Sequence, residues 1–226
     1  MKNIRVSISL GTDEKVSGII TLPDGHTPGR GTGIIIAHGA GNDMENPLLE
    51  AFAEGLAKAG FTALRFNFPY KEKGRKSPDS PKKLVHTWQS ALKFFKEHKT
   101  FSPETIVAAG KSMGGRIASQ MAADGLLDVG RLIFLGYPLH PPGKKEKLRD
   151  THLYKIRQPM LFFAGTRDAL CDLPSLENVL QRLTGTWDLK TIEGGDHSFS
   201  VPNSSGVTTA QVYDQIIRKT CEWLDQ

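Results

Sequence analysis

The sequence predicts an α/β fold: a mostly parallel central sheet with helices on both faces and an antiparallel hairpin at the amino-terminal end. The first observation behind this prediction is that apolar, β-branched segments alternate along the chain with segments of helical period. The second is that residues 33–37 and 160–164 form continuous apolar runs, as in strands that are covered on both faces. Strands that are joined through helices are expected to run parallel.

Size and composition fit a single domain, residues 1–226. A chain of 226 residues can bury a substantial core, and its apolar and charged fractions, 38% and 23%, are ordinary for a water-soluble protein. No apolar run is long enough to span a bilayer, which argues against a membrane protein. Residues 1–5 lead into strand-like alternation and not into the apolar core of a signal peptide, so we expect a cytoplasmic protein.

Charge and cysteine content exclude several function classes. The formal net charge is +5, but the lysines and arginines are scattered or confined to loops, which argues against a nucleic-acid partner. Cys171 and Cys221 are too few for a disulfide framework and have no neighbours at metal-ligand spacing. We expect two free thiols and neither a metal nor an organic cofactor.

The hairpin and the first parallel strand are predicted from alternation and apolar runs. Apolar and polar residues alternate over 4–10 and 16–22, on either side of a turn at Gly11-Thr12-Asp13. A loop rich in glycine and proline follows, and residues 33–39 then form an apolar strand. Next, Asn46 is suited to cap a helix that Gly60 would end.

The remaining elements alternate in the same way. A strand at 61–68 and a basic loop at 69–81 precede a long helix from Pro81, with Leu84, Trp88, Leu92 and Phe95 on one stripe. The expected strands after this helix are 105–109, 131–137, 159–165 and 187–192, and the expected helices are 116–123, 174–183 and 208–224. The last helix is expected to turn Tyr213, Ile217 and Leu224 inward.

The segment Gly110-Lys111-Ser112-Met113-Gly114-Gly115 joins one of these strands to a helix. A strand that runs into a helix through Gly-X-Ser-X-Gly is typical of a nucleophile elbow, a turn so tight that the positions two residues from the serine cannot carry bulk. We therefore predict that Ser112 is a nucleophile at the carboxyl end of its strand. A glycine-rich loop with an incidental serine is the alternative, because short motifs recur by chance.

A nucleophilic serine needs a histidine to take its proton and an acid to orient that histidine. Asp168 follows the strand that ends at Ala164, and His197 follows the strand that ends near Ile192. Parallel strands bring their carboxyl ends to one edge of the sheet, so the three side chains are expected to meet there. The chain order serine, acid, histidine is also the one known for proteins with such an elbow.

Other acids and histidines are weaker candidates. Asp172 is a second candidate for the acid if its loop folds back, whereas Asp196 is expected to face solvent or to cap a turn. His38 is expected to make a structural hydrogen bond at the end of its strand. Surface or core positions are expected for His26, His86, His98 and His152.

An oxyanion formed on the substrate would need two backbone N–H donors. The first is expected from Met113, the residue after the nucleophile. The second is expected from the segment His38-Gly39-Ala40-Gly41-Asn42, with Ala40 as the predicted donor and Gly41 as its competitor. Gly41 and Asn42 are also candidate substrate contacts. A tight turn onto the next helix would favour the same glycines.

On these residues the chain resembles the α/β-hydrolase family over essentially its whole length. It is similar to the small, lidless branch around dienelactone hydrolase, and closer to the group named for the testis-expressed protein 30 and the third regulatory subunit of a lysine acetyltransferase complex. The resemblance implies a serine hydrolase of undefined substrate, although some relatives act as parts of complexes. Dienelactone hydrolases use a cysteine where this chain has Ser112, so their substrate is not carried over. The matching segments are 38–41, 74–76, 110–116, 135–144, 165–168 and 195–197.

The loops suggest an open site. Only about twenty residues separate strand 131–137 from the strand that begins near Pro159, too few for a lid domain. The loop 71–76, together with Lys111 and Lys144-Lys145, is either a basic rim that attracts an anionic substrate or an ordinary solvated surface. Segment 138–143 is either a pocket wall that presents His140 to the substrate or a structural turn.

These observations predict a serine hydrolase of carboxylic esters or thioesters that acts through an acyl-enzyme. Ser112 is the expected nucleophile, His197 the general base and then acid, and Asp168 the residue that orients His197. The expected partner is a small-molecule ester or thioester. The alternatives are a hydrolase-fold scaffold that binds a partner with little or no turnover, and a small serine peptidase. The sequence leaves the oligomeric state open.

Overall fold

The computed structural model describes residues 1–11 and 13–226, and it confirms the predicted fold class. Thr12, in the predicted hairpin turn, lies outside the described residues. Within them, one sheet has the strand order β1-β2-β4-β3-β5-β6-β7-β8. The strands are β1 (Lys2–Ser9), β2 (Lys15–Leu22), β3 (Thr32–Ala37), β4 (Thr62–Phe66), β5 (Thr105–Lys111), β6 (Arg131–Leu135), β7 (Met160–Gly165) and β8 (Trp187–Ile192).

Strand direction follows the connections. The hairpin strands β1 and β2 are antiparallel to each other, and β2 is antiparallel to β4. All pairs from β4 to β8 are parallel, because each of those strands returns through a helix or a crossover loop. The carboxyl ends of β3, β5, β7 and β8 therefore reach the same edge of the sheet.

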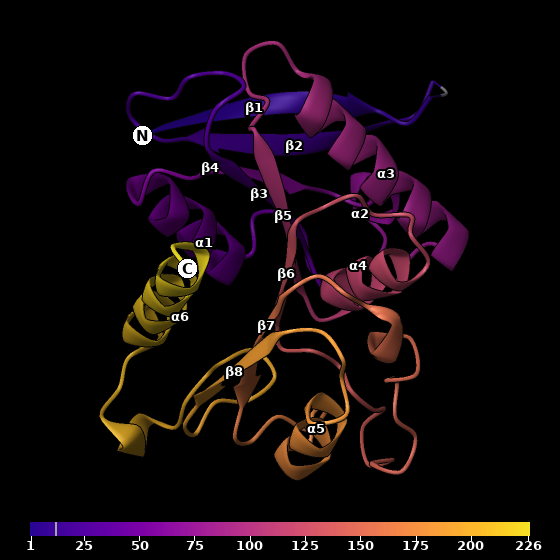
Figure 1. Ribbon diagram of the computed structural model, residues 1–226, viewed down its shortest axis with the longest axis vertical. Coiled ribbons are helices and arrows are strands. Elements are labelled where there is room, and N and C mark those ends of the chain that lie inside the picture. Colours follow the sequence, from indigo (N-terminus) through magenta and orange to yellow (C-terminus); the bar gives the residue numbers. More distant parts are fainter. Residues whose placement is uncertain (12) are drawn as a thin grey trace.

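Helices cover both faces of this sheet (Figure 1). α1 (Pro47–Lys58) and α6 (Thr209–Leu224) pack on one face, and α3 (Pro81–Glu97), α4 (Met113–Ala123) and α5 (Leu173–Leu180) pack on the other. Strands between two layers bury both faces, so successive side chains enter different cores. On β7, for example, Phe162 packs in the core under α3, α4 and α5, whereas Phe163 packs in the core under α1 and α6.

The helix boundaries follow local signals. The side chain of Asn46 accepts a hydrogen bond from the backbone N–H of Leu48 at 3.1 Å, and Pro47 occupies the first helical position of α1. Gly60 follows the end of this helix at φ +96°, a conformation that favours glycine. Part of the predicted loop 69–81 is a one-turn helix instead, α2 (Pro69–Glu72).

The inward face of α6 includes the predicted residues, but its most buried positions lie beside them. Tyr213, Ile217 and Leu224 are half-buried and pack against the core. The fully buried residues of the helix are Val212, Ile216, Thr220 and Trp223. A shift of one residue rotates the face by about 100°. The indole of Trp223 sets this rotation, because it lies in the core and stacks under the guanidinium of Arg131, 5.1 Å from the ring centre.

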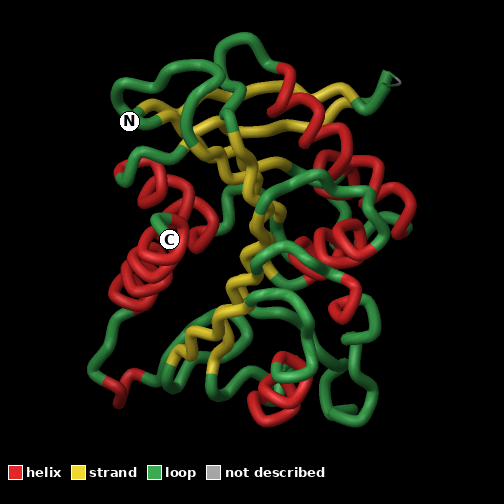
Figure 2. Tube along the Cα trace, viewed as in Figure 1, coloured by secondary structure: helices red, strands yellow, loops and turns green. Residues whose placement is uncertain are grey.

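The connection from β6 to β7 determines how open this edge of the sheet is. The connection from β6 to β7, residues 136–159, contains turns and one short 3-10 helix, Leu153–Lys155, and forms no cap over the sheet edge (Figure 2). In the described part of the chain, no helix has the length and apolar character that a bilayer crossing requires.

Candidate active site

Ser112 lies at the junction of β5 and α4 in a strained backbone conformation, φ 49° and ψ −113°. The neighbouring glycines are required by close backbone packing. A Cβ atom at Gly110 would lie 2.2 Å from the nitrogen of Gly115, and one at Gly114 would lie 2.6 Å from the carbonyl oxygen of Ala37. The turn is therefore restricted to glycine two residues on either side of the serine, as the motif predicts.

The three residues singled out from the sequence lie in hydrogen-bond contact. Nε2 of His197 is 2.8 Å from Oγ of Ser112, and Nδ1 of His197 is 2.7 Å from Oδ2 of Asp168. An ionised carboxylate only accepts hydrogen bonds, so Nδ1 carries the ring proton and Nε2 is free to accept from the serine hydroxyl. The Asp168 side chain is fully buried, while that of His197 is 23% exposed, which leaves the site open to solvent at the histidine.

The remaining oxygen of Asp168 is held as well. Its Oδ1 accepts the backbone N–H of Leu170 at 2.7 Å.

The two alternative acids, Asp172 and Asp196, have structural contacts of their own. Asp172 caps α5 by accepting from the backbone N–H of Ser175 and is paired with Lys145 at 2.5 Å; this lysine lowers the pKa of Asp172 to about 2. Asp196 accepts two backbone N–H groups within its own turn, as expected of a capping residue.

A second serine–histidine pair lies on the buried side of α4. Ser119 Oγ is 2.8 Å from Nε2 of His152, and the phenol oxygen of Tyr137 is 3.1 Å from the same nitrogen. Both hydroxyls donate to backbone carbonyls, those of Arg116 and Arg149, so the ring N–H donates to them and no base faces Ser119. None of the described carboxylates hydrogen-bonds to the His152 ring, and the pair is a structural contact.

The loop after β3 presents free backbone N–H groups next to the serine. The carbonyl of Gly39 accepts from three donors: Nδ1 of His38 at 2.8 Å, the Tyr70 hydroxyl at 3.3 Å and the backbone N–H of Asn42 at 3.3 Å. In a trans peptide the C=O and the following N–H point in opposite directions, so the N–H of Ala40 points away from these donors.

This loop lies close to the nucleophile. A Cβ atom at Gly39 would be 3.4 Å from Cβ of Ser112. Ala40 and Gly41 are exposed, and neither N–H has an acceptor among the described residues. The N–H of Met113, in the first turn of α4, also lacks an intrahelical partner. Asn42 is exposed, and its side chain bonds to no described residue. The arrangement fits two donors at the nucleophile, from Ala40 and Met113.

His140 is a correction to the sequence prediction. The residue is 1% exposed, Nδ1 donates to the carbonyl of Pro141 at 2.9 Å, and Nε2 accepts the backbone N–H of Asp172 at 3.0 Å. Both ring nitrogens are therefore occupied within the protein, which leaves neither free to bind a substrate. The ring joins the 138–143 turn to the start of α5, which is the structural alternative for this segment.

The basic loop 71–76 does not form a free positive rim. Lys73 pairs with Glu14 at 2.7 Å, Arg75 pairs with Asp79 at 2.5 Å, and Lys71 approaches the carbonyl of Gly41. Most of the charge in this loop is therefore balanced by neighbouring oxygens, which weakens the expectation of an anionic substrate. Lys111 is not on the rim either, because it is buried beneath His197.

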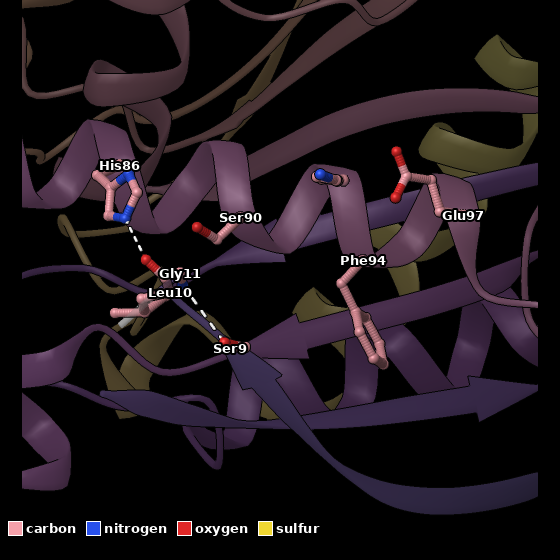
Figure 3. A pocket seen from close by; sticks show the side chains of 8 residues that line it. Ser9, Leu10, Gly11, His86, Ser90, Phe94 and Glu97 are labelled. Atoms are coloured by element: carbon pink, nitrogen blue, oxygen red, sulfur yellow. Dashed lines mark hydrogen bonds between the residues drawn. The ribbon is translucent and has the colours of Figure 1, made fainter. Parts of the chain in front are cut away.

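Surface hollows elsewhere do not include the serine. A hollow of about 430 Å³ lies between the end of β1 and α3, lined by Ser9, Leu10, Ser90 and Phe94 and closed at one side by a hydrogen bond from His86 to the Leu10 carbonyl (Figure 3). β1 is at the edge of the sheet, and three strands lie between it and β5. The hollow is therefore separate from the triad.

Comparison with known proteins places these features in a family. Dienelactone hydrolase from Anabaena variabilis superposes with a TM-score of 0.74 at 21% identity, over 98% of this chain and 96% of that chain. Est1E from Butyrivibrio proteoclasticus gives a TM-score of 0.73 at 16% identity, over 98% and 99%. XC6422 from Xanthomonas campestris, a serine hydrolase without a lid, gives 0.68 at 21% identity, over 88% and 87%. These likenesses show a shared fold. The model of the α/β hydrolase domain family matches residues 30–225, and the chain therefore belongs to the α/β hydrolase domain family.

Proposed function

We propose that this chain is a serine hydrolase of carboxylic esters or thioesters, built as a single domain over residues 1–226. Ser112 is the nucleophile, His197 the general base and then acid, and Asp168 the group that holds His197 in the correct tautomer. The observation that carries the proposal is the unbroken series of hydrogen bonds from Asp168 through His197 to the Ser112 hydroxyl, at 2.7 and 2.8 Å.

The reaction follows from these contacts. As the Ser112 oxygen attacks the carbonyl carbon, its proton moves to Nε2 of His197, and the imidazolium is stabilised by Asp168. The carbonyl oxygen becomes an oxyanion that accepts the N–H groups of Ala40 and Met113. Collapse of this intermediate breaks the ester bond, and the leaving alcohol or thiol takes the proton from Nε2. Water then attacks the acyl-serine by the same route and releases the carboxylic acid.

Water-soluble esters suit this site better than lipids, because the 136–159 connection forms no lid that an interface would open. Among the structural relatives, Est1E has been solved with ferulic acid bound, which agrees with a small acyl group as substrate. Within the family, we place this chain with the group named for the testis-expressed protein 30, on the motifs quoted above.

An active-site-directed probe tests the proposal. A fluorophosphonate should label the protein at Ser112, as located by mass spectrometry, and labelling should disappear in Ser112→Ala and His197→Ala. Ser119→Ala is the matched control, because Ser119 also contacts a histidine but has no base facing it; this variant should label like the wild type. A series of p-nitrophenyl esters would then measure the size of the acyl pocket.

Two results would contradict the enzymatic proposal. One is labelling that persists unchanged in Ser112→Ala. The other is a folded protein that neither reacts with the probe nor hydrolyses any ester of the series, which would favour a scaffold that binds a partner. Cleavage of short peptides with no cleavage of esters would instead favour a serine peptidase.

A further inference from the structure

Lys111 carries a buried charge immediately before the nucleophile. It is the last residue of β5, and it is only 7% exposed. Burying an ammonium group is costly unless hydrogen bonds replace its hydration, so a buried lysine calls for a specific partner. None of the described carboxylates lies within ion-pair distance of its Nζ atom, so the partner is of another kind.

That partner is the backbone of the histidine in the triad. Nζ of Lys111 donates to the carbonyl oxygen of His197 at 2.5 Å, across 86 residues of sequence. The same ammonium lies over the ring of Phe199, 5.5 Å from its centre. Phe199 is fully buried and adopts φ +62°, so the loop at this point holds a strained conformation that its surroundings must support.

Gly136, just after β6, leaves room for this contact. A Cβ atom at this position would lie 3.0 Å from Nζ of Lys111, 3.2 Å from the His197 carbonyl and 3.6 Å from Nδ1 of His197. Its φ of +72° also favours glycine. The ammonium group of Lys111 therefore lies where the ends of β5 and β6 meet the loop after β8.

We propose that Lys111 is a positioning residue that ties the loop carrying His197 to the strand that presents Ser112. Because the tether starts at the residue next to the nucleophile, it fixes the imidazole relative to the hydroxyl directly. A hydrogen bond from a charged donor is stronger than a neutral one, which suits it to hold a loop. The role rests on the proposed hydrolase function, since it concerns the alignment of that triad.

The positive charge of Lys111 also affects the triad. Burial lowers the pKa of Lys111 to about 8, while the carboxylates of Asp168 and Asp196 oppose this change. The titratable groups around Nζ are thus Asp168 after β7, and Asp196 and His197 after β8. As the pH rises through about 8, Lys111 loses its charge, the hydrogen bond to the His197 carbonyl weakens, and activity should fall.

Lys111→Met tests the proposal, because it keeps the length of the side chain and removes the donor. Methionine buries no charge but leaves the His197 carbonyl without this donor, so the variant should still fold, with a similar or slightly lower melting temperature. Its kcat should fall about 10- to 100-fold with a smaller change in KM, as expected for a misplaced catalytic group. The basic limb of its pH profile near pH 8 should disappear. Lys144→Met, an exposed lysine at the same edge, is the matched control and should behave like the wild type.

A second measurement separates this proposal from the function on which it rests. Hydrogen exchange followed by mass spectrometry should show faster exchange over residues 194–202 in Lys111→Met than in the wild type, whether or not the protein hydrolyses any ester. Unchanged exchange, or a Lys111→Met variant with wild-type kcat and wild-type pH profile, would overturn the positioning role. If the wild type has no ester activity, the exchange result alone decides.

Discussion

Nε2 of His38 accepts a hydrogen bond from the backbone N–H of Phe68 at 3.1 Å, which leaves Nδ1 to donate to the carbonyl of Gly39. One nitrogen accepts and the other donates, so the contact requires a neutral ring. The ring is fully buried, and burial lowers the pKa of His38 to about 4. The loop that contains Ala40, the proposed oxyanion donor, is thus held by a histidine that must stay uncharged.

Stability should therefore decrease in mild acid. Burial also lowers the pKa of His152 to about 4. Unfolded histidine titrates near pH 6.5, so between about pH 6.5 and pH 4 the unfolded chain binds more protons than the native state. The free energy of unfolding should be highest above pH 6.5 and fall as the pH decreases through this window. Urea unfolding at several pH values measures this slope, and His152→Gln should reduce it. An equally steep slope in that variant would show that His152 does not contribute to the pH dependence of the free energy of unfolding.

Asp168→Asn should inactivate the protein without unfolding it. An amide at this position no longer fixes the proton of His197 on Nδ1, and the same change in the triad of a serine protease lowers kcat by about 10⁴. Asp172→Asn is the matched control: it should retain activity and most of its stability, because asparagine caps a helix about as well as the aspartate that caps α5 here. Steady-state ester hydrolysis and thermal unfolding distinguish the two. Comparable activity in both variants would rule out Asp168 as the orienting acid.

Tyr70→Phe should slow catalysis by a modest factor. The Tyr70 hydroxyl is one of three donors to the Gly39 carbonyl, and burial raises its pKa to about 12, so it stays protonated and donating at neutral pH. Loss of one such hydrogen bond corresponds to about 1 kcal/mol, or up to about tenfold in kcat, because His38 and Asn42 still hold the peptide. Tyr154→Phe, which removes a hydroxyl bound to Asp150, serves as the control. A loss of about 10³, as for a direct donor, would mean that Tyr70 itself contacts the oxyanion.

Gly114→Ala should be strongly destabilising. The added methyl group would lie 2.6 Å from the carbonyl oxygen of Ala37 and 2.7 Å from that of His38, and these backbone atoms cannot withdraw without disturbing β3. We expect a loss of at least about 3 kcal/mol, or insoluble protein. At Gly130 the nearest atom would be 3.8 Å away, so Gly130→Ala should fold normally. Melting temperatures of the two variants test this contrast, and similar values would argue against the close approach of α4 to β3.

The sequence allowed the strand ends to be predicted because parallel sheets place them at one edge. Ser112 directly follows β5, and Asp168 and His197 lie in the loops just after β7 and β8, so their meeting could be predicted from the connectivity. The roles of His140 and Lys111 could not be read in this way. Both depend on contacts that form only after folding. The His140 ring contacts the N–H of Asp172, and the Lys111 ammonium group contacts the carbonyl of His197.

The sequence predicted residues of α6 that pack against the core but not the most buried ones, for a related reason. Its amphipathic pattern is broad enough to permit two neighbouring faces, and local periodicity does not distinguish them. The choice depends on Arg131, which is distant in sequence and donates to the carbonyl of Trp223 at 2.7 Å. The most buried face of α6 is therefore determined by contacts with segments that are distant in sequence, and not by the local pattern.

The bare connection between β6 and β7 has a consequence for the second half of the reaction. With no structure over the sheet edge, bulk water reaches the acyl-serine throughout its lifetime. Added alcohols must compete with bulk water, so we expect transfer of the acyl group to them to rise only in proportion to their concentration. If the proposed function holds, a protein shaped in this way would end its cycle with a free acid, and its architecture would not favour the synthesis of new esters.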